Sequence, residues 1–330
     1  MDHIKIVRRA LETTWRYRAL WLFGALLALT SGGRGSGGGG GSGGNVTMPG
    51  PQNAFPGLGV AGPPVWVILV IVGVIVLVAF AFAIVSVVVR YLSENALIKM
   101  VDEREETGTE QGIAGGFRLA WSRSAWRFFL IDLVVFLPTI VLFIGGLLLA
   151  ASPLLLWVSE RQALGMAGTI VAIGLLFLVV ILFVAVFIVL GLLRHFFRRV
   201  AALEGRGVLE AIREGFHLVR RHAGDVVLMG LLMVGLGIGV TLLGIPVIIA
   251  LVVLGLLAGG VPGLLLGGLA SLAFDGAVPW IVGLVTGLPL FFLVFGVPAL
   301  FLSGLYETFK STVWTLAYRE LRAMERGGEG

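Results

Sequence analysis

The feature that most limits how this chain folds is the separation of its basic residues from long apolar runs. Twenty-two of its 24 Lys and Arg residues fall in four short segments, residues 1–18, 90–127, 194–225 and 306–330. The sequence between these segments is apolar and almost uncharged. Basic residues are retained in short loops on the cytoplasmic side of a membrane. The pattern therefore predicts a multi-pass protein of the cell (inner) membrane with its N- and C-termini in the cytoplasm.

Composition supports a membrane protein and argues against nucleic-acid binding. The chain is 58% hydrophobic and 13% charged, whereas soluble domains carry about 25% charged residues. A net charge of +5 would suit nucleic acid, but the basic residues lie beside apolar segments, where they meet anionic lipid head groups. We expect the lipid bilayer and its anionic head groups as partners, and no nucleic acid. A membrane protein partner or a homo-oligomer is also compatible with the sequence.

Six apolar segments predict an all-α fold, a polytopic membrane helical bundle that forms one integral domain over residues 1–330. The segments are residues 17–30, 64–91, 127–151, 163–193, 226–257 and 278–305. About 20 apolar residues are needed to cross a hydrocarbon core of about 30 Å, and all but the first segment reach that length. The first also resembles a cleaved signal peptide, but we expect it to be retained because its sequence recurs later. Residues 255–273 fit either an extracytoplasmic loop or a re-entrant pair.

A Gly-rich stretch, residues 31–63, is expected to form an extracytoplasmic loop after the first apolar segment. Residues 37–44 are all Gly except Ser42, a composition typical of a flexible coil. A glycine loop that binds phosphate needs a preceding strand and a following helix, and the sequence indicates neither here.

Weak internal matches suggest that a two-span unit occurs three times, as residues 1–106, 107–205 and 206–326. Five positions match at an offset of 99: Gly108, Ile113, Gly116, Phe117 and Leu119 recur as Gly207, Ile212, Gly215, Phe216 and Leu218. Residues 11–23 match residues 117–129 at an offset of 106, with Trp15 on Trp121. Two spans per unit would keep the copies in one orientation. Chance similarity between amphipathic linkers is the alternative, and the sequence leaves it open.

The basic segments are also predicted to form amphipathic helices on the cytoplasmic face. In residues 1–18, an apolar stripe at helical spacing is formed by Ile4, Val7, Leu11 and Trp15. Similar stripes run through residues 113–121, 208–219 and 309–324. Such helices lie in the membrane interface or pack on the bundle, and the sequence does not decide between the two. The arginines expected to face lipid or a partner are Arg8, Arg9, Arg198, Arg199, Arg220 and Arg221.

Candidate chemistry inside the apolar segments is sparse. Ionisable groups in a membrane mark functional sites by default, and Asp132 is such a group; we expect it to pair with Arg127 or Arg123. Pro246 is expected to kink the fifth segment, because proline removes a backbone donor, and broken helices frame substrate sites in transporters. Glycines spaced four apart predict close helix packing. These pairs are Gly235/Gly239, Gly255/Gly259, Gly263/Gly267 and Gly283/Gly287.

No enzyme motif is apparent. The four His residues lie in the basic segments without the spacing of metal ligands, and the sequence holds neither a His-Glu-x-x-His nor a Gly-x-Ser-x-Gly motif. Thiol chemistry is excluded because there is no cysteine. We therefore expect no catalytic residue, no metal and no cofactor.

Three features carry a resemblance to known proteins. They are the opening Trp-Arg-Tyr-Arg-Ala-Leu-Trp-Leu-Phe-Gly at residues 15–24, the Gly-rich first loop, and the repeated Gly116-Phe117 and Gly215-Phe216 pairs. In these the chain resembles uncharacterised bacterial six-span membrane proteins, similar to the membrane domain fused to some glycerophosphodiester phosphodiesterases. In the fused proteins a separate soluble barrel carries catalysis. The sequence holds no such domain, so the resemblance transfers no catalytic residue.

Together these features predict a non-enzymatic integral membrane protein of structural or accessory type. It would contact lipid or a partner through its basic amphipathic linkers. The alternative is a transporter or permease for a small or lipid-like substrate.

Overall fold

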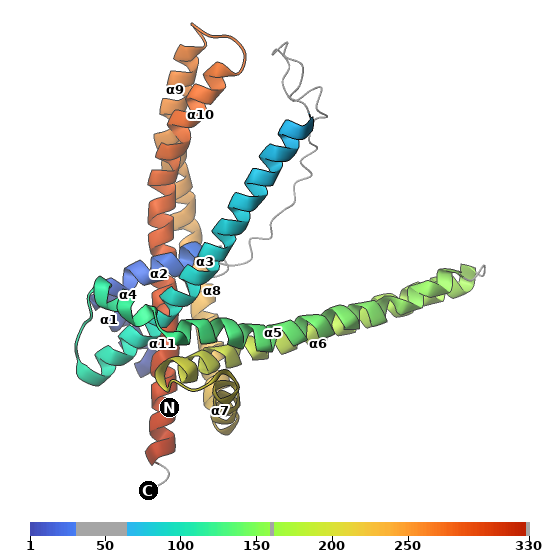
Figure 1. The fold of residues 1–330 in the computed structure, drawn as a ribbon, viewed down its shortest axis with the longest axis vertical. Coiled ribbons are helices and arrows are strands. Elements are labelled where there is room, and N and C mark those ends of the chain that lie inside the picture. The colour runs from blue at the N-terminus through green and yellow to red at the C-terminus, as the bar shows by residue number, and fades with distance from the viewer. Residues whose placement is uncertain (31–64, 159–161, 328–330) are drawn as a thin grey trace. The chain divides into compact units, whose positions relative to one another are not determined.

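The computed structural model describes residues 1–30, 65–158 and 162–327, and every regular element in these ranges is helical. Figure 1 shows the ribbon. The predicted all-α fold class is confirmed for this part of the chain. The Gly-rich stretch predicted as a loop, residues 31–63, lies outside the described residues.

Five helices in the described ranges are long and apolar enough to cross a membrane. They are Leu69–Thr107, Ser124–Trp157, Gln162–Leu203, Ala223–Ala270 and Val278–Gly327. The first predicted span corresponds to α2, Ala19–Thr30, with 12 residues. At 1.5 Å per residue α2 is about 18 Å long, which is shorter than the hydrocarbon core. A sixth span is therefore not confirmed.

The same order of elements occurs three times along the described chain. A short helix is followed, after one or two residues, by an apolar helix and later by a long helix that carries the next basic segment. The first set is α1 (His3–Arg16), α2 and α3 (Val65–Thr107). The second is α4 (Ile113–Ala120), α5 (Arg123–Ala151) and α6 (Gln162–Leu203). The third is α7 (Val208–Arg221), α8 (Ala223–Gly255) with α9 (Val261–Ala270), and α10 (Val278–Phe291) with α11 (Val297–Gly327).

Glycines at matching places end the long helices and begin the short ones. Gly108 follows α3 with φ +70°, and Gly205 lies two residues after α6 with φ +64°. Glycine adopts this left-handed conformation without steric cost, which is why it commonly ends helices. Gly112 and Gly207 then precede α4 and α7 with extended backbones. These turns separate each short helix from the long helix before it.

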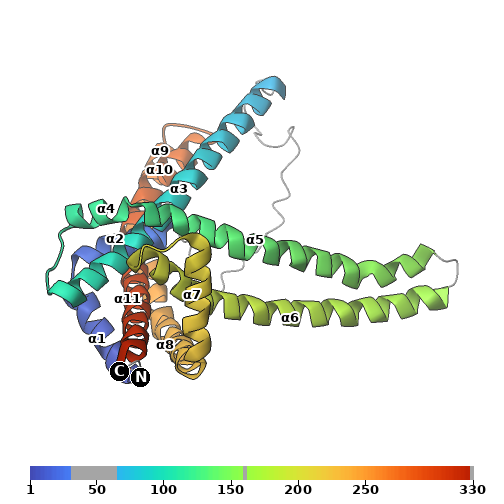
Figure 2. The same cartoon turned by 60° about the horizontal axis from the view of Figure 1, so that its bottom comes forward.

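The chain divides into two compact units, and the first contains Met1–Ala10, Ile98–Leu231 and Ser311–Gly330. Within it α5 and α6 run side by side as a long hairpin (Figures 1 and 2), and α7 packs against both. Its core lies near the base of this hairpin, where Phe128, Ile131, Phe196 and Val200 are fully buried. Large apolar side chains farther along α5 and α6 are exposed, as expected of a hairpin whose surroundings are hydrocarbon.

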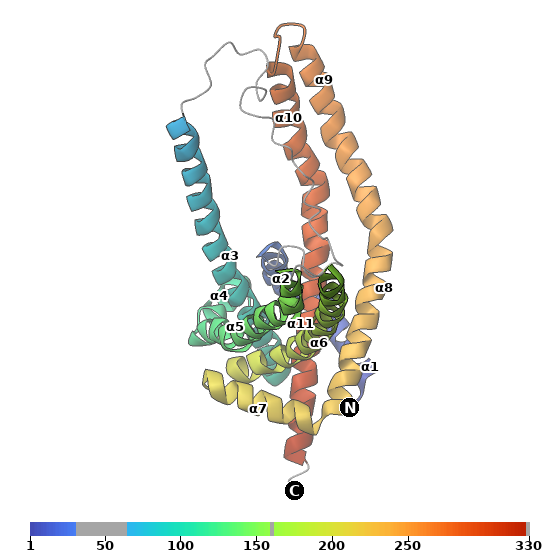
Figure 3. The same ribbon diagram turned by 90° about the vertical axis from the view of Figure 1, so that its right-hand side faces the viewer.

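The second unit contains Leu11–Leu97 and Leu232–Lys310. In it α9 and α10 form an antiparallel hairpin (Figure 3), and α2 lies against the first part of α11. A Cβ on Gly304 would lie 2.6 Å from the backbone nitrogen of Ala25, so the two helices approach closely. The Thr308 hydroxyl donates to the Leu20 carbonyl at 3.2 Å across the same contact.

Residues 255–273, left open between a loop and a re-entrant pair, take neither form. A π-helical turn, η2 (Leu256–Gly260), and α9 extend α8 without a break as far as Ala270. Two such turns occur in the described chain, η2 and η3 (Phe292–Gly296). A proline follows each turn by two residues, Pro262 after η2 and Pro298 after η3. Proline clashes with the carbonyl four residues earlier, and a wider turn relieves that clash. Both turns therefore lie where a following proline would produce this clash.

Candidate functional site

The short helices α1, α4 and α7 turn their predicted apolar stripes outward. In α1, Ile4, Leu11 and Trp15 are exposed, with 65% of Trp15 accessible. In α4 and directly after it, Ile113, Phe117 and Trp121 are exposed, and 78% of Trp121 is accessible. The stripes of α1 and α4 are therefore largely exposed, whereas in the α7 stripe Phe216 is exposed and Val208, Ile212 and Val219 are half-buried.

Small residues on the opposite side hold these helices against the protein. Ala10 in α1, Ala120 in α4 and Ala211 in α7 are fully buried. In α7 a Cβ on Gly215 would lie 2.7 Å from Cδ1 of Phe197, so only glycine allows this approach of α7 to α6. The Gly116-Phe117 and Gly215-Phe216 pairs thus combine a buried glycine with an outward aromatic ring.

Four of the six arginines expected to face lipid or a partner are exposed at the surface. They are Arg8, Arg9, Arg220 and Arg221. Arg9 pairs with Glu105 at 2.5 Å with 60% of its side chain exposed, and Arg221 lies 3.7 Å from Glu325 with 69% exposed. Exposed pairs of this kind hold their partners weakly, so these guanidinium groups are accessible to an external anion.

The expectation for Arg198 and Arg199 is wrong, because both are only 2% exposed. Helix α6 continues ten residues beyond the predicted end of the span, and this extension packs against α5, α7 and the middle of α11. Arg199 donates to the His195 carbonyl at 2.6 Å and to the Ser311 carbonyl at 2.9 Å. Its Nε also donates to the Thr315 hydroxyl at 3.3 Å. Arg199 therefore joins α6 to α11 inside the first unit.

Asp132 pairs with arginines of α6 and not with Arg127. Its carboxylate lies 3.0 Å from Arg194 Nε and 2.5 Å from Arg198 Nη2. Arg127 instead donates to the Gly205 and Arg206 carbonyls, at 2.5 and 3.1 Å. Because the Asp132 pairs cross the base of the α5–α6 hairpin, their role in this structure is to join the two helices.

A second charged cluster was not foreseen from the sequence. Arg322 on α11 lies 2.6 Å from Glu204, 2.7 Å from Glu214 and 2.9 Å from Glu325. The Tyr318 hydroxyl donates to Glu204 and accepts from Arg322 Nε at 3.2 Å. The contacts of Arg322 with Tyr318 and Glu325 have helical spacings that the sequence reveals, whereas Glu204 and Glu214 are more than 100 residues away. The cluster ties the end of α6 and the middle of α7 to α11.

Pro246 does not break its helix. The α-helix α8 runs through it from Ala223 to Gly255, and the departure from α-helical geometry comes later, at η2. The structure therefore gives Pro246 no break that could frame a substrate site.

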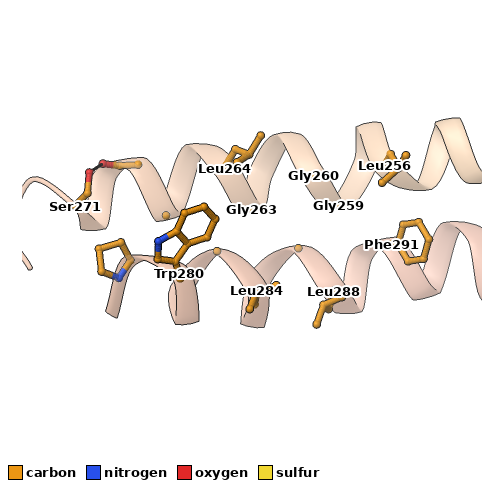
Figure 4. A pocket seen from close by; sticks show the side chains of 15 residues that line it. Leu256, Gly259, Gly260, Gly263, Leu264, Ser271, Trp280, Leu284, Leu288 and Phe291 are labelled. Atoms are coloured by element: carbon orange, nitrogen blue, oxygen red, sulfur yellow. Dashed lines mark hydrogen bonds between the residues drawn. The ribbon is translucent and has the colours of Figure 1, made fainter. Parts of the chain in front are cut away.

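An apolar groove of about 480 Å³ lies along the α9–α10 hairpin (Figure 4). Leu256, Leu264, Leu288 and Phe291 line it together with a row of glycines. The predicted close approach is confirmed for three glycine pairs, 255/259, 263/267 and 283/287, where an added Cβ would lie 2.4–3.0 Å from the nearest atom of the facing segment. For Gly235/Gly239 it is wrong, because a Cβ at either position would meet nothing within 4 Å.

Replacing Gly263 with alanine is expected to lower the stability of the α9–α10 hairpin by about 1–3 kcal/mol. Its Cβ would lie 2.7 Å from the Gly283 carbonyl oxygen, which cannot move without its helix. Gly268→Ala in the same helix is the matched control, since a Cβ there meets nothing within 4 Å. Thermal unfolding of each purified variant in detergent measures the change in its melting temperature. Equal melting temperatures for the two variants would contradict the close packing.

Comparison with known proteins gives one match. A family of unknown function, DUF7544, matches residues 1–317. The chain belongs to DUF7544. No curated protein and no solved structure gives a match to it. The functional residues of this DUF7544 member must therefore be argued from its own geometry.

The described ranges of this DUF7544 chain hold no group of three His, Asp or Glu residues placed to bind a metal ion. The His195 ring stacks on Trp314 with centroids 4.9 Å apart, and His3 lies 3.5 Å from Asp225. The surface that remains as a candidate functional site consists of the outward stripes of α1, α4 and α7 with the arginines beside them.

Proposed function

We propose that this protein is a non-enzymatic, multi-pass protein of the cell (inner) membrane, of structural or accessory type. Its short helices would lie in the cytoplasmic interface, with both termini on that side, and would contact anionic lipid or a membrane protein partner. The observation that carries the proposal is the exposure of the stripes of α1 and α4 and of Phe216 in the stripe of α7. Large apolar side chains beside arginines suit the boundary between acyl chains and head groups.

The distribution of the exposed Trp residues supports the same placement. Trp15, Trp121 and Trp126 are exposed near the junctions of short helices with apolar helices. Tryptophan is enriched at membrane interfaces, because its ring is apolar while its N–H seeks a polar partner. The proposal also includes the similarity to the membrane domain fused to some glycerophosphodiester phosphodiesterases, and the threefold internal repeat of a two-span unit. The recurring order of elements agrees with triplication.

The test is purification of the full chain from its native membrane in mild detergent, with mass spectrometry of the co-eluting lipids and proteins. We expect the wild type to retain anionic lipid, or one protein partner, in excess over the other co-eluting lipids and proteins. Charge reversal of Arg8, Arg9, Arg220 and Arg221 to Glu should abolish that excess. Arg326→Glu, at the exposed end of α11, is the control and should retain it. If the fourfold variant keeps the same lipids and proteins as the control, the arginines do not make the contact.

A permease for a lipid-like substrate is the second candidate, and the apolar groove between α9 and α10 is the observation that favours it. The groove could hold an acyl chain, since its lining is almost free of polar groups. Co-purification of one enriched metabolite or lipid that the fourfold charge reversal leaves in place would favour this candidate.

A further inference from the structure

A group of cationic and hydroxyl side chains lies where the last part of α3 meets the start of α5, within the first unit. Lys99 Nζ donates to Ser122 Oγ at 2.9 Å. Ser122 Oγ lies 2.7 Å from Ser124 Oγ. Arg127 follows Ser124 by about one turn of α5, close enough to Lys99 for its positive charge to act on the ammonium group. Ser124 is buried, while Lys99 and Arg127 are half-buried.

The two cations lack carboxylate partners. In the described part of the chain, neither Lys99 nor Arg127 has an Asp or Glu oxygen within 4 Å. Glu103 lies one turn beyond Lys99 on α3, but it accepts from the Gln111 amide at 2.7 Å. Glu204 and Glu214 are held by Arg322. The known contacts of Arg127 are the carbonyls of Gly205 and Arg206, which carry no net charge.

Two like charges in a half-buried place repel each other and have lost part of their hydration, so an anion between them would be stabilised. The donors present also suit one kind of anion. An ammonium, a guanidinium and two hydroxyls can supply several hydrogen bonds to the oxygens of a tetrahedral phosphate. Lysine binds phosphate as a point charge, and arginine does so through its planar fork.

We propose that Lys99, Ser122, Ser124 and Arg127 form a binding site for a phosphate group. The phosphate belongs to a phospholipid head group or to a soluble phosphate ion. Trp121 precedes Ser122 and Trp126 precedes Arg127 in the sequence, and they are 78% and 65% exposed. If they anchor at the interface, the cluster lies at head-group depth. The inference goes beyond the proposed function, which assigns lipid contact to the surface arginines of α1 and α7.

The experiment uses the full chain in nanodiscs, with Lys99→Gln as the test variant. In discs of phosphatidylcholine, binding of inorganic phosphate is titrated calorimetrically against sodium chloride of equal ionic strength. In discs that also contain phosphatidylglycerol, native mass spectrometry counts the anionic lipids retained after the disc is removed. Lys99→Gln should weaken binding about tenfold, the loss of one charge-assisted contact. Lys99→Arg, which keeps the charge, should restore most of it.

Arg326→Gln is the matched control, because it removes an exposed arginine at the end of α11 that belongs neither to this cluster nor to the arginines proposed to contact lipid. Arg127→Gln is less suitable as the first variant, since it also releases the carbonyls that Arg127 holds. Retention of phosphatidylglycerol without phosphate binding would identify a head-group site. Phosphate binding alone would identify a soluble ligand, and both together a site that accepts either. If Lys99→Gln behaves like Arg326→Gln in both measurements, or the wild type binds neither, the proposal is overturned.

Discussion

Replacing Asp132 with alanine is expected to destabilise the protein by about 3–5 kcal/mol, the usual cost of removing one partner of a buried ion pair. Asp132 is the carboxylate that both Arg194 and Arg198 contact, and only 3% of the Arg198 side chain is exposed. Without Asp132 that guanidinium stays buried near Arg194 and loses its closest counter-charge. Chemical unfolding of the purified protein in detergent measures the change in free energy.

The control for this prediction is Asp275→Ala. Asp275 is an exposed residue in the turn between α9 and α10, beside Gly276 with φ +77°. Its loss should change the free energy of unfolding by less than about 0.5 kcal/mol. Asp132→Asn keeps the shape of the side chain, so its change in the free energy of unfolding should fall between those of Asp132→Ala and Asp275→Ala. A destabilisation by Asp132→Ala no larger than that of the control would show that the pairs across the hairpin do not support the fold.

Replacing Arg322 with methionine is expected to release α7 from α11 and to cost about 1.5–3 kcal/mol, the range for hydrogen bonds to charged groups. Three carboxylates from α7, α11 and the residue after α6 lie within 2.6–2.9 Å of Arg322. Methionine keeps most of the apolar part of the Arg322 side chain, so the change in stability reports mainly the loss of the guanidinium charge. The three Glu residues would then repel one another, and the cationic partners left to them in the described part of the chain are Arg206 and Arg221, at 3.4–3.8 Å.

Hydrogen–deuterium exchange measures this release directly. Amides of α7 should exchange about thirtyfold faster in Arg322→Met, the factor that corresponds to about 2 kcal/mol. Arg326→Met, one turn later on α11 and exposed, should leave them unchanged. Equal exchange in the two variants would mean that buried apolar contacts alone hold α7 in place.

The short helices and the long apolar helices could be predicted from the sequence, because apolar periodicity and glycine positions determine structure within one or two helical turns. The bounds of α4 and α7 lie close to those predicted from the stripes at residues 113–121 and 208–219. The fourth stripe, residues 309–324, proved to be part of the continuous helix α11. No Gly or Pro separates it from the preceding span, which was predicted to end at residue 305, so nothing in the chain ends the helix there.

The misplaced residues depended on distant contacts. Arg198 and Arg199 have the composition of an interfacial basic pair, and only packing from α5 and α11 makes them buried. The sequence predicts the partner of Asp132 five or nine residues away on its own helix, whereas the observed arginines lie 62 and 66 positions away on α6. Lys99 and Ser122 are likewise brought together only by the turn between α3 and α4.

The placement of α4 and α7 in the membrane interface is tested most directly by spin labels at adjacent residues. The chain has no cysteine, so Phe117→Cys, Arg118→Cys, Phe216→Cys and His217→Cys each give one labelling site, and all four positions are exposed. In liposomes, labels at 117 and 216 should collide mainly with oxygen, which concentrates in hydrocarbon. Labels at 118 and 217 should collide mainly with a water-soluble nickel complex. If all four labels have the same accessibility to both reagents, the helices do not lie in the interface.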